Sequence, residues 1–158
     1  MQHAPLPIDV KRLHHVGWIV PDESSLDVFV EAISLEVVLR YRVEEFQAEC
    51  IFLSPATVHE AAQEPPTGLL ELIIPSGGIL ARFNKGHGGL HHVAYEVDDL
   101  QAATASLTAA GLPPVEPSAV NAGPFFVSFL APAVTRGLTV ELVQRHSDYS
   151  LFAPGTEL

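Results

Sequence analysis

The residues best suited to chemistry in this sequence are two pairs of adjacent histidines. His14-His15 and His91-His92 each stand in a short apolar stretch followed by an acidic residue and a helix-like segment. A shift of 77 positions maps the second stretch onto the first, so that His92 falls on His15. Such an internal duplication predicts two modules of the same kind.

Strand geometry predicts which histidine of each pair could work with the other. Neighbouring side chains on a strand point to opposite faces, so only one histidine of a pair can face a given interior. His15 and His92 share their face with small residues, Gly17 and Ala94, and His14 and His91 are expected to face away. A single histidine of this kind is more often a satisfied polar residue, but two equivalent ones favour a shared task.

A glutamate within the last strand-like stretch of each half is the second unusual feature. Glu71 and Glu141 both stand among apolar residues. A buried unpaired carboxylate costs several kcal/mol, so each must lie at an edge, pair with a cation, be protonated or bind a metal. Because basic residues are scarce, two imidazoles and two carboxylates together make a sensible ligand set for a divalent metal.

Composition limits the class of protein. The 158 residues are 47% hydrophobic and 17% charged, which predicts one globular domain over residues 1–158. The net charge of −11 argues against nucleic acid or a membrane surface as a partner. A single cysteine, Cys50, and the lack of a signal-like N-terminus favour the cytoplasm.

The elements that would position these residues follow from periodicity and from turn residues. Each half is expected to read β-α-β-β-β, with module 1 at about 12–76, module 2 at about 89–145 and a tail at 146–158. The expected strands are 13–20, 37–43, 49–53, 69–74, 90–97, 113–120, 125–130 and 138–143. Helices are expected at 24–33 and 100–110, a helical turn at 79–83 and a loop at 54–68. The fold class is therefore α+β.

Three segments of the sequence resemble the vicinal oxygen chelate superfamily. They are Leu13–Gly17, Gly89–Asp99 and Gly137–Gln144, and the connector Leu80–Gly89 adds to them. Within the superfamily the sequence is most similar to the methylmalonyl-CoA epimerase family, over about residues 12–145. The resemblance implies two tandem βαβββ modules forming a curved mixed sheet around a metal site.

The resemblance also implies which residues bind the metal and which act in catalysis. The metal ligands would be His15, Glu71, His92 and Glu141, which hold one divalent ion: Co, Ni, Mn, Zn or Fe. Glu141 and Glu71 would be the catalytic acid/base groups. The chain departs from the epimerase pattern in having Glu71 where glutamine is usual, as in glyoxalase I.

Four further residues have predicted roles, three from the same resemblance and one, Lys85, from its position in a glycine-rich loop. A catalytic glutamate of some epimerases falls near Cys50, with Glu49 beside it on the opposite face, so both are possible additional catalytic groups. Lys85 and Arg136 are the candidates for substrate binding, Arg136 being what remains of a basic loop before the last strand.

The predicted function is that of a metal-dependent epimerase or isomerase that abstracts an α-proton and stabilises an enolate. Its substrate would be a small molecule, possibly a 2-substituted acyl-CoA such as methylmalonyl-CoA, and the protein is expected to form a homodimer. Three alternatives remain open at this stage. They are a glyoxalase I-type lactoylglutathione lyase, a non-haem iron dioxygenase and a non-catalytic binding or resistance protein.

Overall fold

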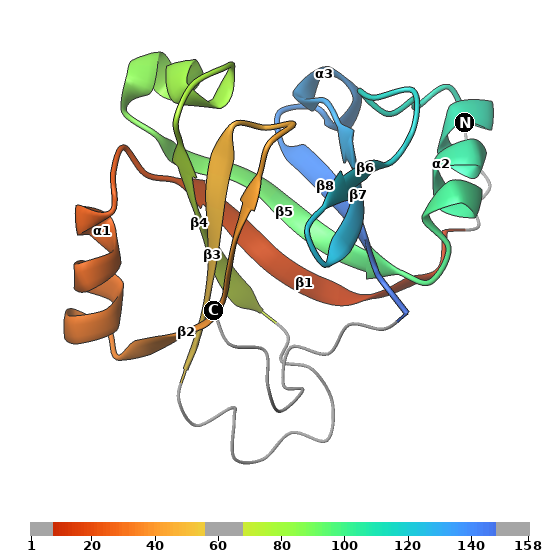
Figure 1. Cartoon of the computed structure of the whole chain (residues 1–158). Helices are drawn as coiled ribbons and strands as arrows, with labels where there is room; N and C mark the ends of the chain where they lie inside the picture. The colour runs from red at the N-terminus through yellow and green to blue at the C-terminus, as the bar shows by residue number, and fades with distance from the viewer. Residues whose placement is uncertain (1–7, 56–67, 148–158) are drawn as a thin grey trace. The chain divides into compact units, whose positions relative to one another are not determined.

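The computed structural model describes residues 8–55 and 68–147. Eight strands form one mixed sheet in the order β2-β3-β4-β1-β5-β8-β7-β6, and Figure 1 labels them. Their bounds are β1 Val10–Ile19, β2 Leu35–Val43, β3 Ala48–Pro55, β4 Leu69–Pro75, β5 Gly89–Val97, β6 Val120–Ala122, β7 Phe125–Leu130 and β8 Thr139–Arg145. The helical elements are α1 Ser24–Asp27, the π-helical turn η1 Val28–Ala32, the 3₁₀ segment η3 Leu80–Gly86, α2 Leu100–Ala109 and α3 Pro132–Thr135. The predicted fold class, two βαβββ modules in a mixed sheet, is confirmed.

The chain divides into two compact units, and the boundary between them falls within β1 and within β5. The N-terminal unit comprises residues 15–91, and the C-terminal unit comprises residues 8–14 together with 92–147. The first five residues of β1 therefore belong with the second half of the chain. The tail beyond residue 147 and most of the predicted loop at 54–68 lie outside the described residues.

In the N-terminal unit, β1 pairs in parallel with β4, and β4, β3 and β2 pair antiparallel. Its core is apolar and lies on the strands that follow the first helix, with Ile51, Leu53 and Leu72 almost fully buried. The predicted helix at 24–33 is split into α1 and the π-helical turn η1, and Ser34 ends it with φ of 62°. The parallel β1–β4 pair is the part that matters for chemistry, because it carries His15 and Glu71.

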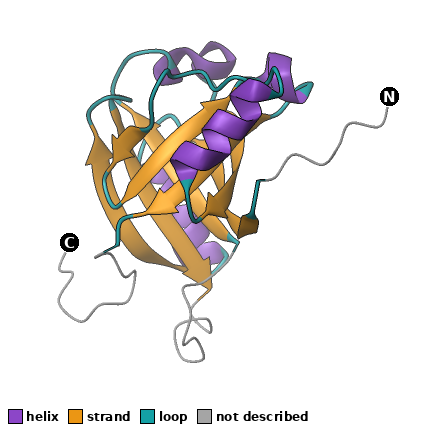
Figure 2. Cartoon of the chain, turned by 90° about the vertical axis from the view of Figure 1, so that its right-hand side faces the viewer, coloured by secondary structure: helices purple, strands orange, loops and turns teal. Residues whose placement is uncertain are grey.

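The C-terminal unit repeats this arrangement with β5 parallel to β8 and with β8, β7 and β6 antiparallel. Figure 2 shows α2 lying across the strands of this unit. Leu100, Ala103 and Leu107 of α2 pack against Leu130 and Leu142, as helical periodicity predicts. The helix begins where the Asp99 side chain accepts a hydrogen bond of 2.8 Å from the Ala102 backbone N–H.

One predicted strand is wrong. Residues 113–120 contain only the first residue of β6, because Pro113, Pro114 and Pro117 have no backbone N–H to donate to a ladder. A short helix, α3, was not predicted. Among the described residues, no helix has the length and apolar character needed to cross a membrane.

Candidate metal centre

The N-terminal unit holds the first histidine–glutamate pair. His15 lies on β1, and Glu71 lies on β4 opposite Gly17, two residues further along. The His15 Nε2 and Glu71 Oε2 atoms are 3.3 Å apart, and the two side chains are 3% and 7% exposed. The Phe52 ring packs edge-on against the imidazole with a centroid distance of 5.0 Å. The pair is therefore held in a largely apolar setting.

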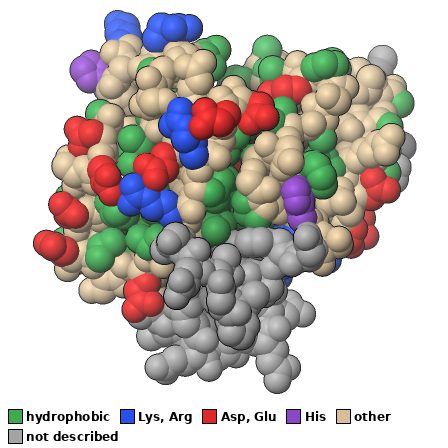
Figure 3. All heavy atoms as spheres, in the orientation of Figure 1, with side chains coloured by type: hydrophobic (Ala, Val, Ile, Leu, Met, Phe, Trp, Pro, Cys, Tyr) green, Lys and Arg blue, Asp and Glu red, His purple; other side chains and the backbone are tan. Residues whose placement is uncertain are grey.

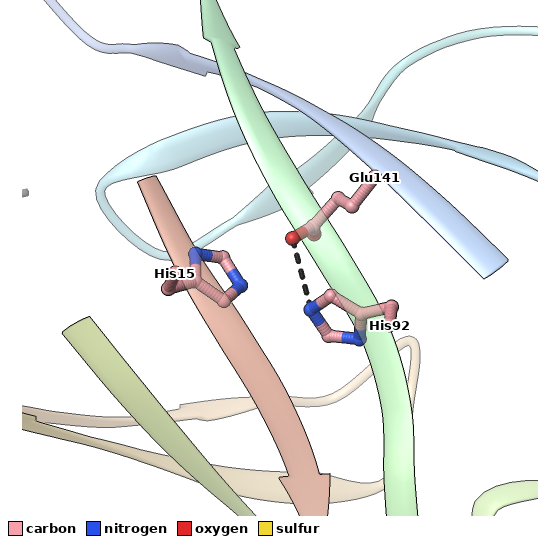
Figure 4. A group of neighbouring side chains, drawn as sticks. All are labelled: His15, His92 and Glu141. Carbon is pink, nitrogen blue, oxygen red and sulfur yellow. Dashed lines mark ion pairs between the residues drawn. The ribbon is translucent and has the colours of Figure 1, made fainter. Parts of the chain in front are cut away.

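The C-terminal unit holds the second pair in the same arrangement. His92 lies on β5, and Glu141 lies on β8 opposite Ala94. The His92 Nε2 and Glu141 Oε2 atoms are 3.1 Å apart, a contact that Figure 4 marks with a dashed line. Phe129 packs edge-on against this imidazole at 5.5 Å. The duplication in sequence is thus also a duplication of side-chain contacts.

A small residue allows each histidine to approach its glutamate. This residue lies two positions after the histidine on the same strand and directly opposite the glutamate on the neighbouring strand. Gly17 and Ala94 are buried, and each stands directly opposite the glutamate of the neighbouring parallel strand. Because side chains two residues apart share a face, the imidazole and the carboxylate meet above this small residue. A larger side chain at Gly17 or Ala94 would fill the space between them.

The donor atoms suit a divalent metal ion. Two ligands in neighbouring positions around such an ion, each bonded at about 2.1 Å, lie roughly 3.0–3.4 Å apart. The separations of 3.3 and 3.1 Å within the two pairs fall in this range. His15, His92 and Glu141, drawn in Figure 4, offer a His-His-Glu donor set that could hold a metal. Imidazole nitrogen with carboxylate oxygen is a donor set for Zn, Fe, Mn, Co or Ni.

The prediction that His14 faces away is wrong. His14 is buried and packs edge-on against Phe125 at 5.0 Å within the C-terminal unit. Phe125 shares a face of β7 with Phe129, which lies opposite Glu141, so His14 reaches the same face as that glutamate. The burial pattern of β1 has two consecutive buried residues at 14 and 15, which a strict alternation does not produce. His91 is half-buried and packs edge-on against Phe83 at 5.1 Å.

The two additional catalytic candidates on β3 lie on opposite faces of that strand, as predicted. Glu49 accepts a 2.6 Å hydrogen bond from Arg40 Nε, an ion pair on the face away from Glu71. Cys50 is buried and shares a face with Phe52, which lies opposite Glu71. Of the two, only Cys50 is on the Glu71 face.

The two predicted substrate-binding residues are both exposed. Lys85 lies in η3 of the N-terminal unit, and Arg136 follows α3 in the C-terminal unit with φ of 64°. Neither forms an ion pair with the described residues.

Sequence reasoning missed a buried ionic cluster in the C-terminal unit. Glu96 is 3% exposed and accepts hydrogen bonds from Arg12 Nε at 2.6 Å and from Arg145 Nε at 2.8 Å. Burial raises the pKa of Glu96, but the hydrogen bonds and charges of the two arginines outweigh it and hold the pKa below its usual value. The burial of Glu96 could have been predicted, because Glu96 follows the same two-residue alternation as His92 and Ala94 on β5.

Comparisons with known proteins identify the family of this chain. The model of the Glyoxalase/Bleomycin resistance protein/Dioxygenase superfamily matches residues 14–129. Among curated proteins, none matches this sequence.

Several solved structures share the fold. Methylmalonyl-CoA epimerase from Mycobacterium tuberculosis is similar with a TM-score of 0.76 and 21% identity, over 92% of this chain and 93% of that one. A variant of Streptomyces coelicolor methylmalonyl-CoA epimerase in complex with 2-nitronate-propionyl-CoA has a TM-score of 0.75 and 21% identity, over 88% of this chain and 100% of that one. At this identity the likeness shows the fold alone.

Proposed function

Since this chain belongs to the glyoxalase/bleomycin resistance protein/dioxygenase superfamily, we propose that it is a metal-dependent epimerase or isomerase. The reaction would remove and return a proton next to a carbonyl group, on a 2-substituted acyl thioester such as methylmalonyl-CoA. The observation that carries this proposal is the buried histidine–glutamate pair that occurs once in each unit. One divalent ion held by His15, Glu71, His92 and Glu141 would use both pairs.

The two glutamates supply the acid/base chemistry. The bound ion would act as a Lewis acid that polarises a substrate carbonyl and makes the neighbouring proton easier to remove. Glu141 is our choice for the base that takes the α-proton, and Glu71 for the group that returns a proton from the other side. Glu49 is the less suitable second group, because its carboxylate is engaged by Arg40.

The similar structures support the substrate class. One is described as methylmalonyl-CoA epimerase in complex with methylmalonyl-CoA and NH4+, at 22% identity and a TM-score of 0.75. The S. coelicolor variant holds an acyl-CoA analogue. Homodimer formation and a cytoplasmic location stay predictions.

Deuterium exchange tests the proposal directly. The metal-loaded protein, incubated with methylmalonyl-CoA in D₂O, should introduce deuterium at the α-carbon, as measured by mass spectrometry, while the chiral centre racemises. Glu141→Gln should slow this exchange by about 10²-fold or more, since it removes the base. Glu44→Gln, at an exposed residue paired with Arg42, is the matched control and should exchange at the wild-type rate. Racemisation without deuterium incorporation, or no exchange by a metal-loaded protein, would contradict the proposal.

A glyoxalase I-type reaction is the second candidate. The observation that favours it is the carboxylate of Glu71, which gives the donor set two glutamates instead of the glutamine and glutamate usual in epimerases. Turnover of methylglyoxal with glutathione, in the absence of activity on acyl thioesters, would support this alternative.

A further inference from the structure

We propose that Arg82, Lys85 and His87 form an anion site that binds the phosphate groups of a coenzyme A thioester. These three residues are called the connector patch below. The inference rests on the proposed function and adds to it the part of the chain that would recognise the carrier end of the substrate. All contacts that carry it lie within the N-terminal unit.

The two cations of the connector patch, Arg82 and Lys85, have no ion-pair partner in the described part of this acidic protein. Among the described residues, Lys11 pairs with Asp98, Arg12 and Arg145 share Glu96, Arg40 pairs with Glu23 and Glu49, and Arg42 pairs with Glu44. Within this described part, the cations that form no ion pair are Arg82, Lys85 and Arg136. Two of these three stand three residues apart in η3, and His87 follows directly after it.

The stretch of sequence that carries the patch contains no acidic residue. The chain has 19 acidic residues, yet none stands between Glu71 and Glu96. Arg82, Lys85 and His87 are all exposed. In Figure 3, blue and purple side chains gather at the upper left, over the position of η3 in Figure 1. An anionic group approaching this face would meet local positive charge despite the net charge of −11.

The backbone holds the patch in a fixed turn. Asn84 and Lys85 both have left-handed conformations, with φ of 49° and 57°, which cost about 1 kcal/mol or more each. The Asn84 side chain donates a 2.8 Å hydrogen bond to the Gly88 carbonyl, and the His87 N–H donates to the Asn84 carbonyl at 3.1 Å. Lys85 is therefore presented from a closed turn, which lowers the entropy lost when it binds a ligand.

A small hollow lined mostly by apolar residues lies beside the patch. It has a volume of about 110 Å³ and is bordered by the ends of β1 and β4 and by η3. Its lining includes Ile19, Pro75 and Phe83. Ile19 and Pro75 each lie four residues beyond His15 and Glu71 on the same strands, a distance of about 13 Å at 3.3 Å per residue. A coenzyme A thioester has its carbonyl at one end, its phosphates at the other and a flexible arm between them, so it could reach from the glutamate to the patch.

Binding measurements on truncated ligands test this assignment. Isothermal titration calorimetry would compare coenzyme A, dephospho-coenzyme A, pantetheine and inorganic phosphate on the metal-loaded wild type and on the Arg82→Gln/Lys85→Gln double variant. Two charge-assisted contacts to phosphate predict that the double variant binds coenzyme A about tenfold or more weakly. Pantetheine affinity should be unchanged. Arg42→Gln, which removes an exposed but paired cation, should leave coenzyme A affinity within about twofold.

Several outcomes would overturn the inference. They are unchanged coenzyme A affinity in the double variant, equal loss of pantetheine binding, and inorganic phosphate binding as tightly as coenzyme A. Steady-state kinetics distinguish a failure of the anion site from a failure of the proposed function. The double variant should raise the KM for methylmalonyl-CoA with little change in kcat, and should leave activity on methylmalonyl-pantetheine intact. If the wild type exchanged no proton on methylmalonyl-CoA or on methylmalonyl-pantetheine, the proposed function would be refuted. The calorimetric result on coenzyme A binding would not be affected.

Discussion

Glu71 is the candidate ligand that carries a carboxylate where the resemblance to the epimerases implies a glutamine. Its carboxylate lies 3.3 Å from His15 and is almost fully buried. A glutamine at this position would keep an oxygen donor and remove one negative charge, whereas an alanine would remove the donor altogether. The pair of substitutions therefore separates ligand loss from charge loss.

We expect Glu71→Ala to weaken the binding of a divalent metal by about tenfold or more, and Glu71→Gln to weaken it less. Metal titration with elemental analysis of the purified variants measures both effects. Equal, undiminished metal content in wild type and Glu71→Ala would show that Glu71 is not a ligand.

Gly88 is the position in the connector where a side chain would collide with β1. Its φ is +70°, and a Cβ added there would lie 2.2 Å from the backbone carbonyl oxygen of Ile19. Gly111 has a similar φ of +79° but has open space around it.

Gly88→Ala should therefore destabilise the protein by more than Gly111→Ala, which carries only the backbone strain of about 1–2 kcal/mol. Chemical denaturation of both variants measures the difference. If both variants lost the same free energy of unfolding, the turn at Gly88 would be able to move away from β1 without a loss of stability.

At the scale of elements, Glu96 joins three strands of the C-terminal unit. Its carboxylate on β5 accepts from Arg12 on β1 and from Arg145 on β8. The cluster lies within the C-terminal unit, to which the first residues of β1 belong. Removing a carboxylate from a buried ionic cluster leaves its cations uncompensated, which is costlier than losing an exposed pair.

Glu96→Gln should lower the free energy of unfolding by roughly 3 kcal/mol at pH 7. The pKa of Glu96 is below its usual value of 4.5 in the fold, so its stabilising contribution is present above that pH and is lost as the pH falls through the lowered pKa. The difference between variant and wild type should therefore shrink in acid. Asp98→Asn, at an exposed residue paired with Lys11, is the control and should cost less than about 1 kcal/mol. A difference that does not depend on pH would contradict the electrostatic account.

At the scale of the whole molecule, the proposed metal centre draws one histidine from each unit. A ligand that binds only the folded state stabilises it by about 2.7 kcal/mol at one hundred times its Kd. If His15 and His92 bind the same ion, the loss of either should abolish this effect.

The unfolding midpoint of the wild type should rise when a divalent metal is added and fall when a chelator removes it. His15→Ala and His92→Ala should each lose most of this shift, whereas His146→Ala, in the segment after β8, should keep it. Differential scanning calorimetry with and without chelator makes the comparison. A full metal-dependent shift in either of the first two variants would mean that the two units do not share one ion.

Much of the fold could be predicted because its signals are local. The apolar alternation of β5 and β7 can be read from neighbouring residues, and the duplication from two short stretches 77 positions apart. The strand predicted at 113–120 failed because a period-2 pattern says nothing about missing donors, and the prolines there supply none. The histidines and glutamates of the two pairs were also identified in advance, since buried polar residues in apolar strands need a partner.

The sequence by itself determined the duplicated module, the four candidate ligands and the acidic net charge. Only the tertiary structure decided which glutamate meets which histidine, that Arg40 engages Glu49, and that His14 is buried against Phe125. The physical reason is that strand register joins residues more than forty positions apart, and a shift of one residue would turn each side chain to the other face. That register is set by packing of the whole core, which no local pattern encodes.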